Sequence, residues 1–327
     1  MDAARRHGPF AMISASSYRI FALLWFVSLV IWWQAIAATF ALARKQDAHS
    51  HILIILPVSI ALILIQWRGT PRPSIRWGSA WLGLSLLIAI AGFRWGRADL
   101  FSGDVRLALE ILALVTWWIG CFVGCFGGLI SRACLFPLLF LLWLIPIPEF
   151  ALAYIISFLQ QGTAWLTRWL LVTVSVPVVQ DGTTLTIPGL TVRVAEECSS
   201  IQSSMMLVVC SMVLSYLLLR SFWGRMVVTL AAIPLAIAKN AIRVFSLAVL
   251  AAYVDPGVLN SPLHRHGGPL YLALALACVS ILIWCVRQAE RRMARRHPPG
   301  MSLGFDIITP REPRSSCNST LKAQEQP

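Results

Sequence analysis

The chain has 327 residues, of which 58% are hydrophobic and 13% are charged, and its mean hydropathy is +0.74. Soluble domains are about half apolar and about a quarter charged, so this composition excludes them and predicts an integral membrane protein. The net charge of +13 does not indicate nucleic-acid binding, because the arginines stand singly or in pairs between apolar runs, as topology anchors do.

Apolar runs of a length that can cross a bilayer, about 20 residues, define the predicted elements. In chain order they cover residues 20–42, 51–67, 77–93, 107–130, 133–147, 199–219, 226–253 and 269–286. We therefore expect an all-α polytopic membrane protein with about eight transmembrane helices. The first run lacks a small-residue cleavage site, so we expect a transmembrane helix there and not a cleaved signal peptide.

Residues 150–171 form an ambiguous segment, because the polar and small residues 160–163 lie at its centre. We interpret the segment as an interfacial or re-entrant helix, and a full span remains the alternative. In residues 172–195, Val, Thr and Ile alternate around the turn signals Asp181-Gly182 and Pro188-Gly189. This pattern predicts a small extracytoplasmic β-hairpin.

The distribution of Lys and Arg gives the orientation. If the N-terminus is inside and residues 150–171 do not cross the membrane, the inner segments hold the larger share of the basic residues, as cytoplasmic loops do. A spanning 150–171 would place the basic stretch from Arg287 to Arg296 outside, which the same rule disfavours. We expect N-terminal transmembrane helices in 1–134, a membrane core in 135–286 and a basic, disordered cytoplasmic tail in 287–327.

Cys198 differs in its surroundings from the other cysteines of the chain. It follows Glu196 and Glu197 and precedes a long apolar run, whereas Cys317 lies in the polar tail. The remaining cysteines lie inside apolar runs, where we expect them to be small core residues: Cys121, Cys125, Cys134, Cys210, Cys278 and Cys285. Since no His or carboxylate accompanies them at ligand spacing, we expect neither a metal site nor a cofactor.

Counting the spans places an arginine and two histidines on the same side of the membrane as Cys198. Arg243 lies in the outer half of run 226–253, with Lys239 one turn deeper and Asn240 beside it. A charge inside a membrane helix is costly enough to indicate function. The loop that follows carries His264 and His266.

A thiol, a guanidinium and an imidazole are together the parts of a cysteine transferase. Cys198 would attack as a thiolate, a histidine would remove and return the proton, and Arg243 would stabilise the oxyanion. Glu196 and Glu197 would either oppose the thiolate or orient the histidine. Each residue alone has an ordinary structural explanation, and only their convergence favours catalysis.

At these positions the chain resembles the exosortase/archaeosortase family of membrane cysteine transpeptidases. The first family motif is an acid, any residue, Cys-Ser-Gly, an aliphatic residue, Arg or Gln, and Ser. It corresponds to Glu196, Cys198, Ser199, Ser200, Ile201, Gln202 and Ser203, with Ser200 in place of the glycine. The other motifs correspond to Ile233-Pro234-Leu235-Ala236 with Asn240 and Arg243, to His264 with Gly268, and to the proline-containing stretch Leu142 to Glu149.

The resemblance covers about residues 135–286 and implies a function. It implies that Cys198 is the nucleophile, Arg243 the positioning cation and His264 the acid/base, with His266 as the fallback and Glu196, Ser199 and Asn240 in supporting roles. The substrates would be proteins with a C-terminal sorting signal, often containing Pro-Glu-Pro, followed by a transmembrane helix and a basic end. The resemblance also implies a multi-pass protein of the bacterial inner membrane, with a periplasm-facing site and a link to exopolysaccharide export.

Two other classes of function compete with this interpretation. In a polytopic transporter or flippase, Arg243 and Lys239 would line a substrate path and Cys198 would be dispensable. In an assembly subunit for polysaccharide export, all three residues would be replaceable. The sequence leaves open the recognised signal, the acceptor nucleophile and the oligomeric state.

Overall fold

The computed structural model describes residues 15–67, 78–96, 102–188, 190–194, 201–253 and 268–296. Residues in the other segments, including 195–200 and 254–267, lie outside this description. The first half of the chain is helical: α1 (Ala15–Ile31), α2 (Trp33–Lys45), η1 (Asp47–His49), α3 (Ile52–Trp67), α4 (Gly78–Gly96), α5 (Gly103–Ala133), α6 (Leu135–Phe140) and η3 (Leu141–Leu144).

The second half begins with a helix and a small sheet and ends with three long helices. These elements are α7 (Glu149–Thr173), β1 (Val179–Asp181), β2 (Thr184–Ile187), β3 (Leu190–Arg193), α9 (Ile201–Leu218), α10 (Phe222–Tyr253) and α12 (Gly268–Arg296). The last helix runs beyond residue 286, where we predicted its end, so the first residues of the predicted tail are helical.

The all-α membrane class is confirmed, but the prediction of eight transmembrane helices is not. Five segments of the described chain are long and apolar enough to cross a bilayer: Asp47–Gln66, Gly103–Ala133, Ile201–Leu218, Phe222–Tyr253 and Gly268–Met293. Two bent helix pairs raise the number to seven if each counts as one span. Gly83–Trp95 is a shorter apolar helix.

One bent pair divides a predicted span, and the other joins a predicted span to the ambiguous segment 150–171. Run 20–42 is divided between Ser17–Ile31 and Trp33–Lys45, which meet at 72°. At this bend the buried Trp32 packs edge-on against Phe93. Run 133–147 contains only the short helical stretch Leu135–Leu144, which meets α7 at 98°. The Pro-containing link at 145–148 explains this second break, because proline lacks the amide proton that a continuing helix needs.

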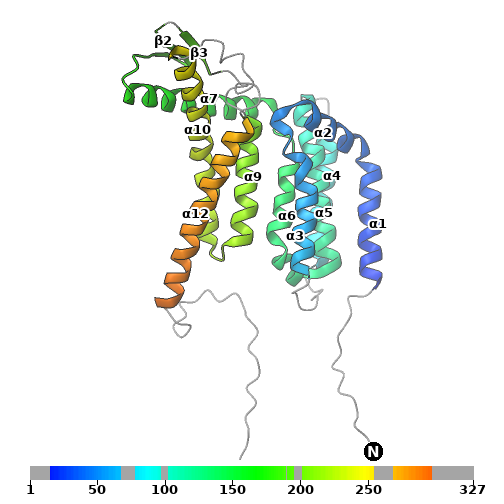
Figure 1. Ribbon diagram of the computed structural model, residues 1–327. Coiled ribbons are helices and arrows are strands. Elements are labelled where there is room, and N and C mark those ends of the chain that lie inside the picture. Colours follow the sequence, from blue (N-terminus) through cyan, green and yellow to red (C-terminus); the bar gives the residue numbers. More distant parts are fainter. Residues whose placement is uncertain are drawn as a thin grey trace, which may run out of the picture.

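Helix α7 lies across one end of the helix bundle. Figure 1 shows it running across α9, α10 and α12, with the sheet on its far side. The start of α9, the end of α10 and the start of α12 are at this same end (Figure 1). This arrangement is the one expected of an interfacial or re-entrant helix, and α7 is not among the five segments of the described chain that qualify by themselves as spans.

The extramembrane element is a three-stranded antiparallel sheet in the order β1-β2-β3, where we predicted a two-stranded hairpin. The first predicted turn is confirmed: Asp181 pairs with Thr184, and Gly182 has a φ of +57°, which glycine adopts without strain. The second turn signal separates β2 from β3, so it adds a strand. Leu185 and Ile187 turn inward from β2 and pack toward α7 and α10.

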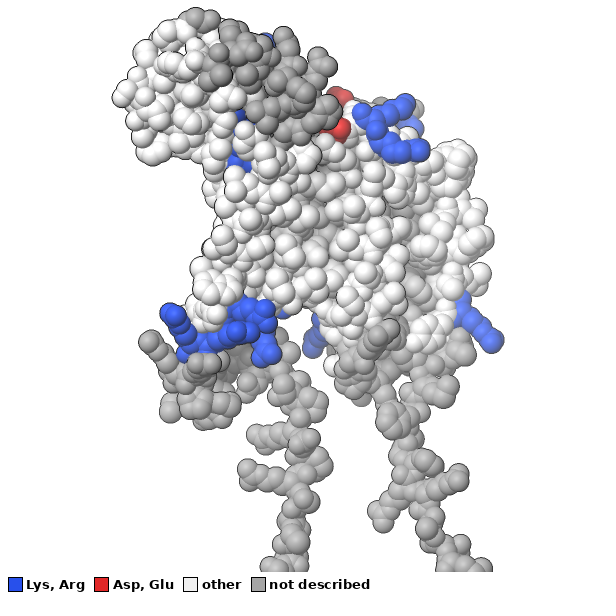
Figure 2. Space-filling view, viewed as in Figure 1, with Lys and Arg blue, Asp and Glu red and all other residues white. Residues whose placement is uncertain are grey.

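On the face that Figure 2 shows, the surface between the two ends of the bundle carries little charge. Lys and Arg gather at both ends there, and the side chains between them are almost all uncharged. Large apolar side chains are exposed along this band, for example Leu64 on α3 and Ile281 and Trp284 on α12. Because lipid tails solvate such side chains as well as a protein core does, this band is the membrane-facing surface.

Candidate active site

Helix α10 carries three polar side chains on a buried face. Arg243 is 8% exposed, Lys239 is 5% exposed and Asn240 is fully buried. Lys239 and Arg243 are four residues apart, so they lie one above the other on the same face of the helix. Arg243 lies ten residues before the end of α10 at Tyr253, which corresponds to about 15 Å along the helix axis.

The first turn of α9 is hydrogen-bonded to this face of α10. The Lys239 ammonium donates to the Ser203 hydroxyl oxygen. The Asn240 side-chain amide donates to Ser204 Oγ at 3.4 Å. Both serines are buried and both lie in the first turn of α9, which begins at Ile201. The two motif regions predicted to act together are therefore in direct contact through their described residues.

Helix α7 packs against the same part of α10. Gly162 allows a close approach, because an added Cβ would lie 3.0 Å from Ile237 Cδ1 of α10. Thr167 donates its hydroxyl to the Ala241 carbonyl at 3.4 Å. Thr163, one turn earlier, is fully buried, and its hydroxyl has no hydrogen-bond partner among the described residues. We call the set Thr163, Thr167, Ser203, Ser204, Lys239, Asn240 and Arg243 the buried polar layer.

The other predicted site residues lie outside the described residues: Glu196, Cys198, Ser199, His264 and His266. The described helices still fix where the chain segments that carry these residues join the bundle. Cys198 lies three residues before the start of α9, and His264 four residues before the start of α12. Both helices begin at the end of the bundle where α10 finishes (Figure 1). The chain segments that carry the predicted nucleophile and acid/base thus join the bundle at one end.

Sequence reasoning missed the contributions from α7 and from the N-terminal region. Thr163 and Thr167 are separated by one helical turn, which was the available signal for a polar face on α7. A second missed feature is His49 in η1, which is 2% exposed and lies with Nε2 3.3 Å from the Ile147 carbonyl oxygen. Beside it, Ala48 packs against Ile201 at the start of α9. The N-terminal helices therefore contact the candidate site.

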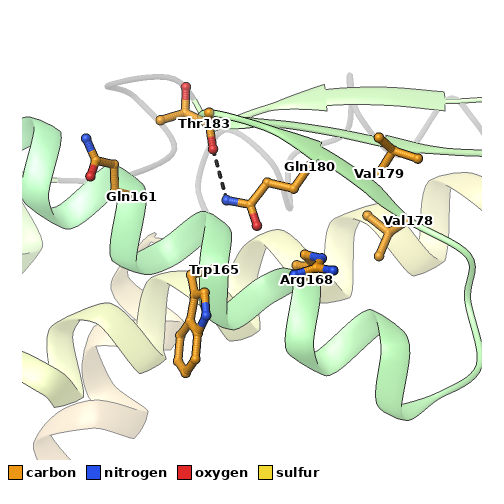
Figure 3. A pocket seen from close by; sticks show the side chains of 8 residues that line it. Gln161, Trp165, Arg168, Val178, Val179, Gln180 and Thr183 are labelled. Atoms are coloured by element: carbon orange, nitrogen blue, oxygen red, sulfur yellow. Dashed lines mark hydrogen bonds between the residues drawn. The ribbon is translucent and has the colours of Figure 1, made fainter.

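A cavity of about 750 Å³ lies between α7 and the strands. Its polar lining residues include Gln161, Arg168 and Gln180, and the Gln180 amide donates to the Gly182 carbonyl at 2.9 Å. Figure 3 shows these side chains around the space beneath β1, while the indole of Trp165 extends from α7 away from the strands. The cavity lies at the bundle end that carries the buried polar layer.

The chemistry available to the buried polar layer is that of cations and hydroxyls. A guanidinium and an ammonium held out of water interact strongly with a nearby anion, whether a carboxylate or a developing oxyanion. Among the described residues, no three His, Cys, Asp or Glu side chains gather as metal ligands.

Comparison with known proteins identifies a family. The family model for transmembrane exosortases matches residues 32–284. Searches of curated proteins and of solved structures find no match. The match begins in the N-terminal helices and so extends beyond residues 135–286, where we first identified the resemblance. Since it covers well over half of the chain, this protein belongs to the transmembrane exosortase family.

Proposed function

We propose that this chain is a membrane cysteine peptidase or transpeptidase that cleaves the C-terminal sorting signal of exported proteins through a thioacyl-enzyme. Family membership supports this proposal, and so does the buried Arg243, which lies one helical turn beyond Lys239, the residue that donates to Ser203 in the first turn of α9. A buried guanidinium has a large desolvation cost, which a bundle without a functional need for the charge would avoid. This burial of Arg243 is the observation that carries the proposal.

The proposed cycle assigns one step to each residue. The Cys198 thiolate attacks the carbonyl carbon of the scissile peptide, and the Arg243 guanidinium stabilises the oxyanion of the tetrahedral intermediate. As the C–N bond breaks, His264 gives a proton to the leaving amine, and the acyl group stays on sulfur as a thioester. Water or an acceptor amine then attacks the thioester and releases the thiol. His266 is the fallback for His264, and Glu196 and Ser199 are proposed to support the nucleophile.

The proposed substrates share the membrane with the enzyme. A protein that carries a sorting motif, often Pro-Glu-Pro, before a transmembrane helix and a basic end would present the scissile bond near the membrane surface. The buried polar layer lies close to the bundle end where α7 crosses, which suits such a substrate. We further propose an inner-membrane location, a periplasm-facing site and a link to exopolysaccharide export.

The test follows processing of a reporter protein with a C-terminal sorting signal from the same genome. Cys198→Ala is expected to abolish cleavage, and Arg243→Met to slow it by about a hundredfold or more, as expected when an oxyanion donor is removed. The matched control is Cys210→Ala, which removes a thiol from the interior of α9 and leaves cleavage unchanged. Mass spectrometry of the wild-type protein should find the acyl adduct on Cys198.

A transporter or flippase is the second candidate, because Lys239 and Arg243 are cations inside membrane helices. The same variants separate the candidates. A transporter would retain its function after Cys198→Ala, and an assembly subunit would tolerate loss of Cys198, Arg243 and His264 alike. Unchanged processing in Cys198→Ala refutes the peptidase proposal.

A further inference from the structure

Lys239 is a buried ammonium without a carboxylate partner among the residues that the structure describes. Its hydrogen-bond partner there is the neutral hydroxyl of Ser203. The salt bridge found in the described part of the chain, between Arg106 and Glu110, lies on α5. An ammonium has three N–H donors, and the described residues supply one acceptor for them. Its charge and its remaining donors therefore call for an anion.

Arg243, on the same face of α10, makes an anion near Lys239 still more favourable. Arg243 lies one turn away and carries the same sign of charge, so each cation disfavours the other. A bundle that buries two like charges gains stability when an anion enters between or beside them. A carboxylate fits Lys239, because its two oxygens accept the N–H groups of a compact ammonium and leave the Ser203 contact in place.

Lys239 lies near one end of the bundle. Ser203 is the third residue of α9, so the Lys239 ammonium lies beside the first turn of that helix. Helix α7 crosses the bundle at this end, and the cavity between α7 and the strands lies there as well. A substrate that brings its scissile bond to this end would bring an acidic side chain next to that bond toward Lys239.

We propose that Lys239 binds a carboxylate of the sorting-signal substrate and so sets a preference for an acidic residue close to the cleaved bond. This inference rests on the proposed function. It assigns a specificity role to a residue for which the proposed cycle has no step. The same carboxylate chemistry is available from Glu196 or Glu197 of the chain itself, so the experiment separates the two sources.

The first experiment measures cleavage kinetics of the full-length protein in membranes with three reporters, which carry Glu, Gln or Lys at the acidic position of the signal. Wild type is expected to prefer the Glu reporter over the Gln reporter by at least about tenfold, the value of one charge-assisted hydrogen bond. Lys239→Met should reduce this preference to less than about twofold, chiefly through a higher KM on the Glu reporter. Lys239→Arg should keep part of the preference.

The matched control is Lys45→Met, which removes an exposed lysine at the end of α2, at the same end of the bundle, and should leave the preference intact. The charge exchange is the stricter test: Lys239→Glu should cleave the Lys reporter at least about tenfold better than wild type does. Continued cleavage of the Gln reporter by Lys239→Met would show that the variant folds.

Three results would overturn the inference. One is an equal loss on all reporters in Lys239→Met, which indicates a structural role. Another is an unchanged preference for Glu in that variant. The third is a preference for Glu that is absent in wild type and appears in Glu197→Gln, which assigns the carboxylate on Lys239 to the chain itself. Each of these leaves Cys198-dependent cleavage in place, so a failure of this inference differs from a failure of the proposed function.

Discussion

Single residues decide how closely the helices of this bundle can approach and where they bend. Gly162 brings α7 against Ile237 of α10, and this approach is what places Thr167 within reach of the Ala241 carbonyl. A larger side chain at Gly162 would separate the two helices and open the buried polar layer. Such small-residue contacts are common in membranes, where packing and hydrogen bonds replace the hydrophobic effect between helices.

Gly127 gives a prediction at this scale. Its backbone has φ 80° and ψ 167°, a region that only glycine occupies readily, and it kinks α5. Gly127→Ala should therefore destabilise the folded protein by about 1–3 kcal/mol. Gly128→Ala is the matched control, because an added Cβ there meets nothing within 4 Å. Thermal unfolding in detergent should show a lower midpoint for the first variant alone, and equal midpoints would contradict the role of the kink.

Helix boundaries followed from the sequence more reliably than helix directions. Hydropathy located α3, α9 and α10 to within a few residues, because a buried or lipid-facing helix leaves a continuous apolar run. The same signal joined α1 to α2 and gave α6 the length of a span, because hydropathy does not record bends. The 98° turn before α7 depends on the prolines at 146 and 148, and their effect on direction was not predicted.

Part of the candidate site could also be predicted from the sequence, and part could not. The inward position of Asn240 and Arg243 follows from helical periodicity once the span is known. The contact of Lys239 with Ser203 did not follow, because it depends on how α9 and α10 pack. The Thr residues of α7 were missed because a threonine in an apolar helix usually bonds to its own backbone.

Helix α7 gives a prediction at the scale of the element. One face of it exposes a stripe of large side chains: Phe150, Tyr154, Phe158, Trp165, Trp169 and Val172. Aromatic side chains with this spacing are typical of a helix that lies in the head-group layer of a membrane. Spin labels at residues 150, 158 and 169 should therefore report the same depth from collision with oxygen and with a water-soluble nickel complex.

The control for α7 is α12, whose exposed residues Leu270, Leu274 and Ile281 lie on a helix that qualifies as a span. Labels there should differ in depth by about 1.5 Å for each residue of separation. The same gradient along α7 would mean that this helix spans the bilayer, and the orientation of every later helix would then be reversed.

At the scale of the whole molecule, the basic residues mark the two ends of the bundle. Arg220 and Arg225 lie at the turn between α9 and α10, and Arg287 and Arg291 lie near the end of α12, at the end away from α7. Arg44 and Lys45 lie at the opposite end, with the sheet. The backbone amides of Arg220 and Ser221 donate to Glu290, which ties the loop before α10 to the last helix.

The proposed orientation places the end that carries α7 outside and the end of α12 in the cytoplasm. With Cys198 and Cys317 replaced by Ser, Lys45→Cys should react with a membrane-impermeant maleimide in intact spheroplasts. Arg292→Cys should react only after the membrane is opened, because a charged reagent does not cross the hydrocarbon layer. Both substituted positions are exposed in the structure, so access depends on the side of the membrane and not on burial. Labelling of Arg292→Cys in intact spheroplasts would place the buried polar layer near the cytoplasmic face, where exported substrates could not reach Lys239 or Arg243.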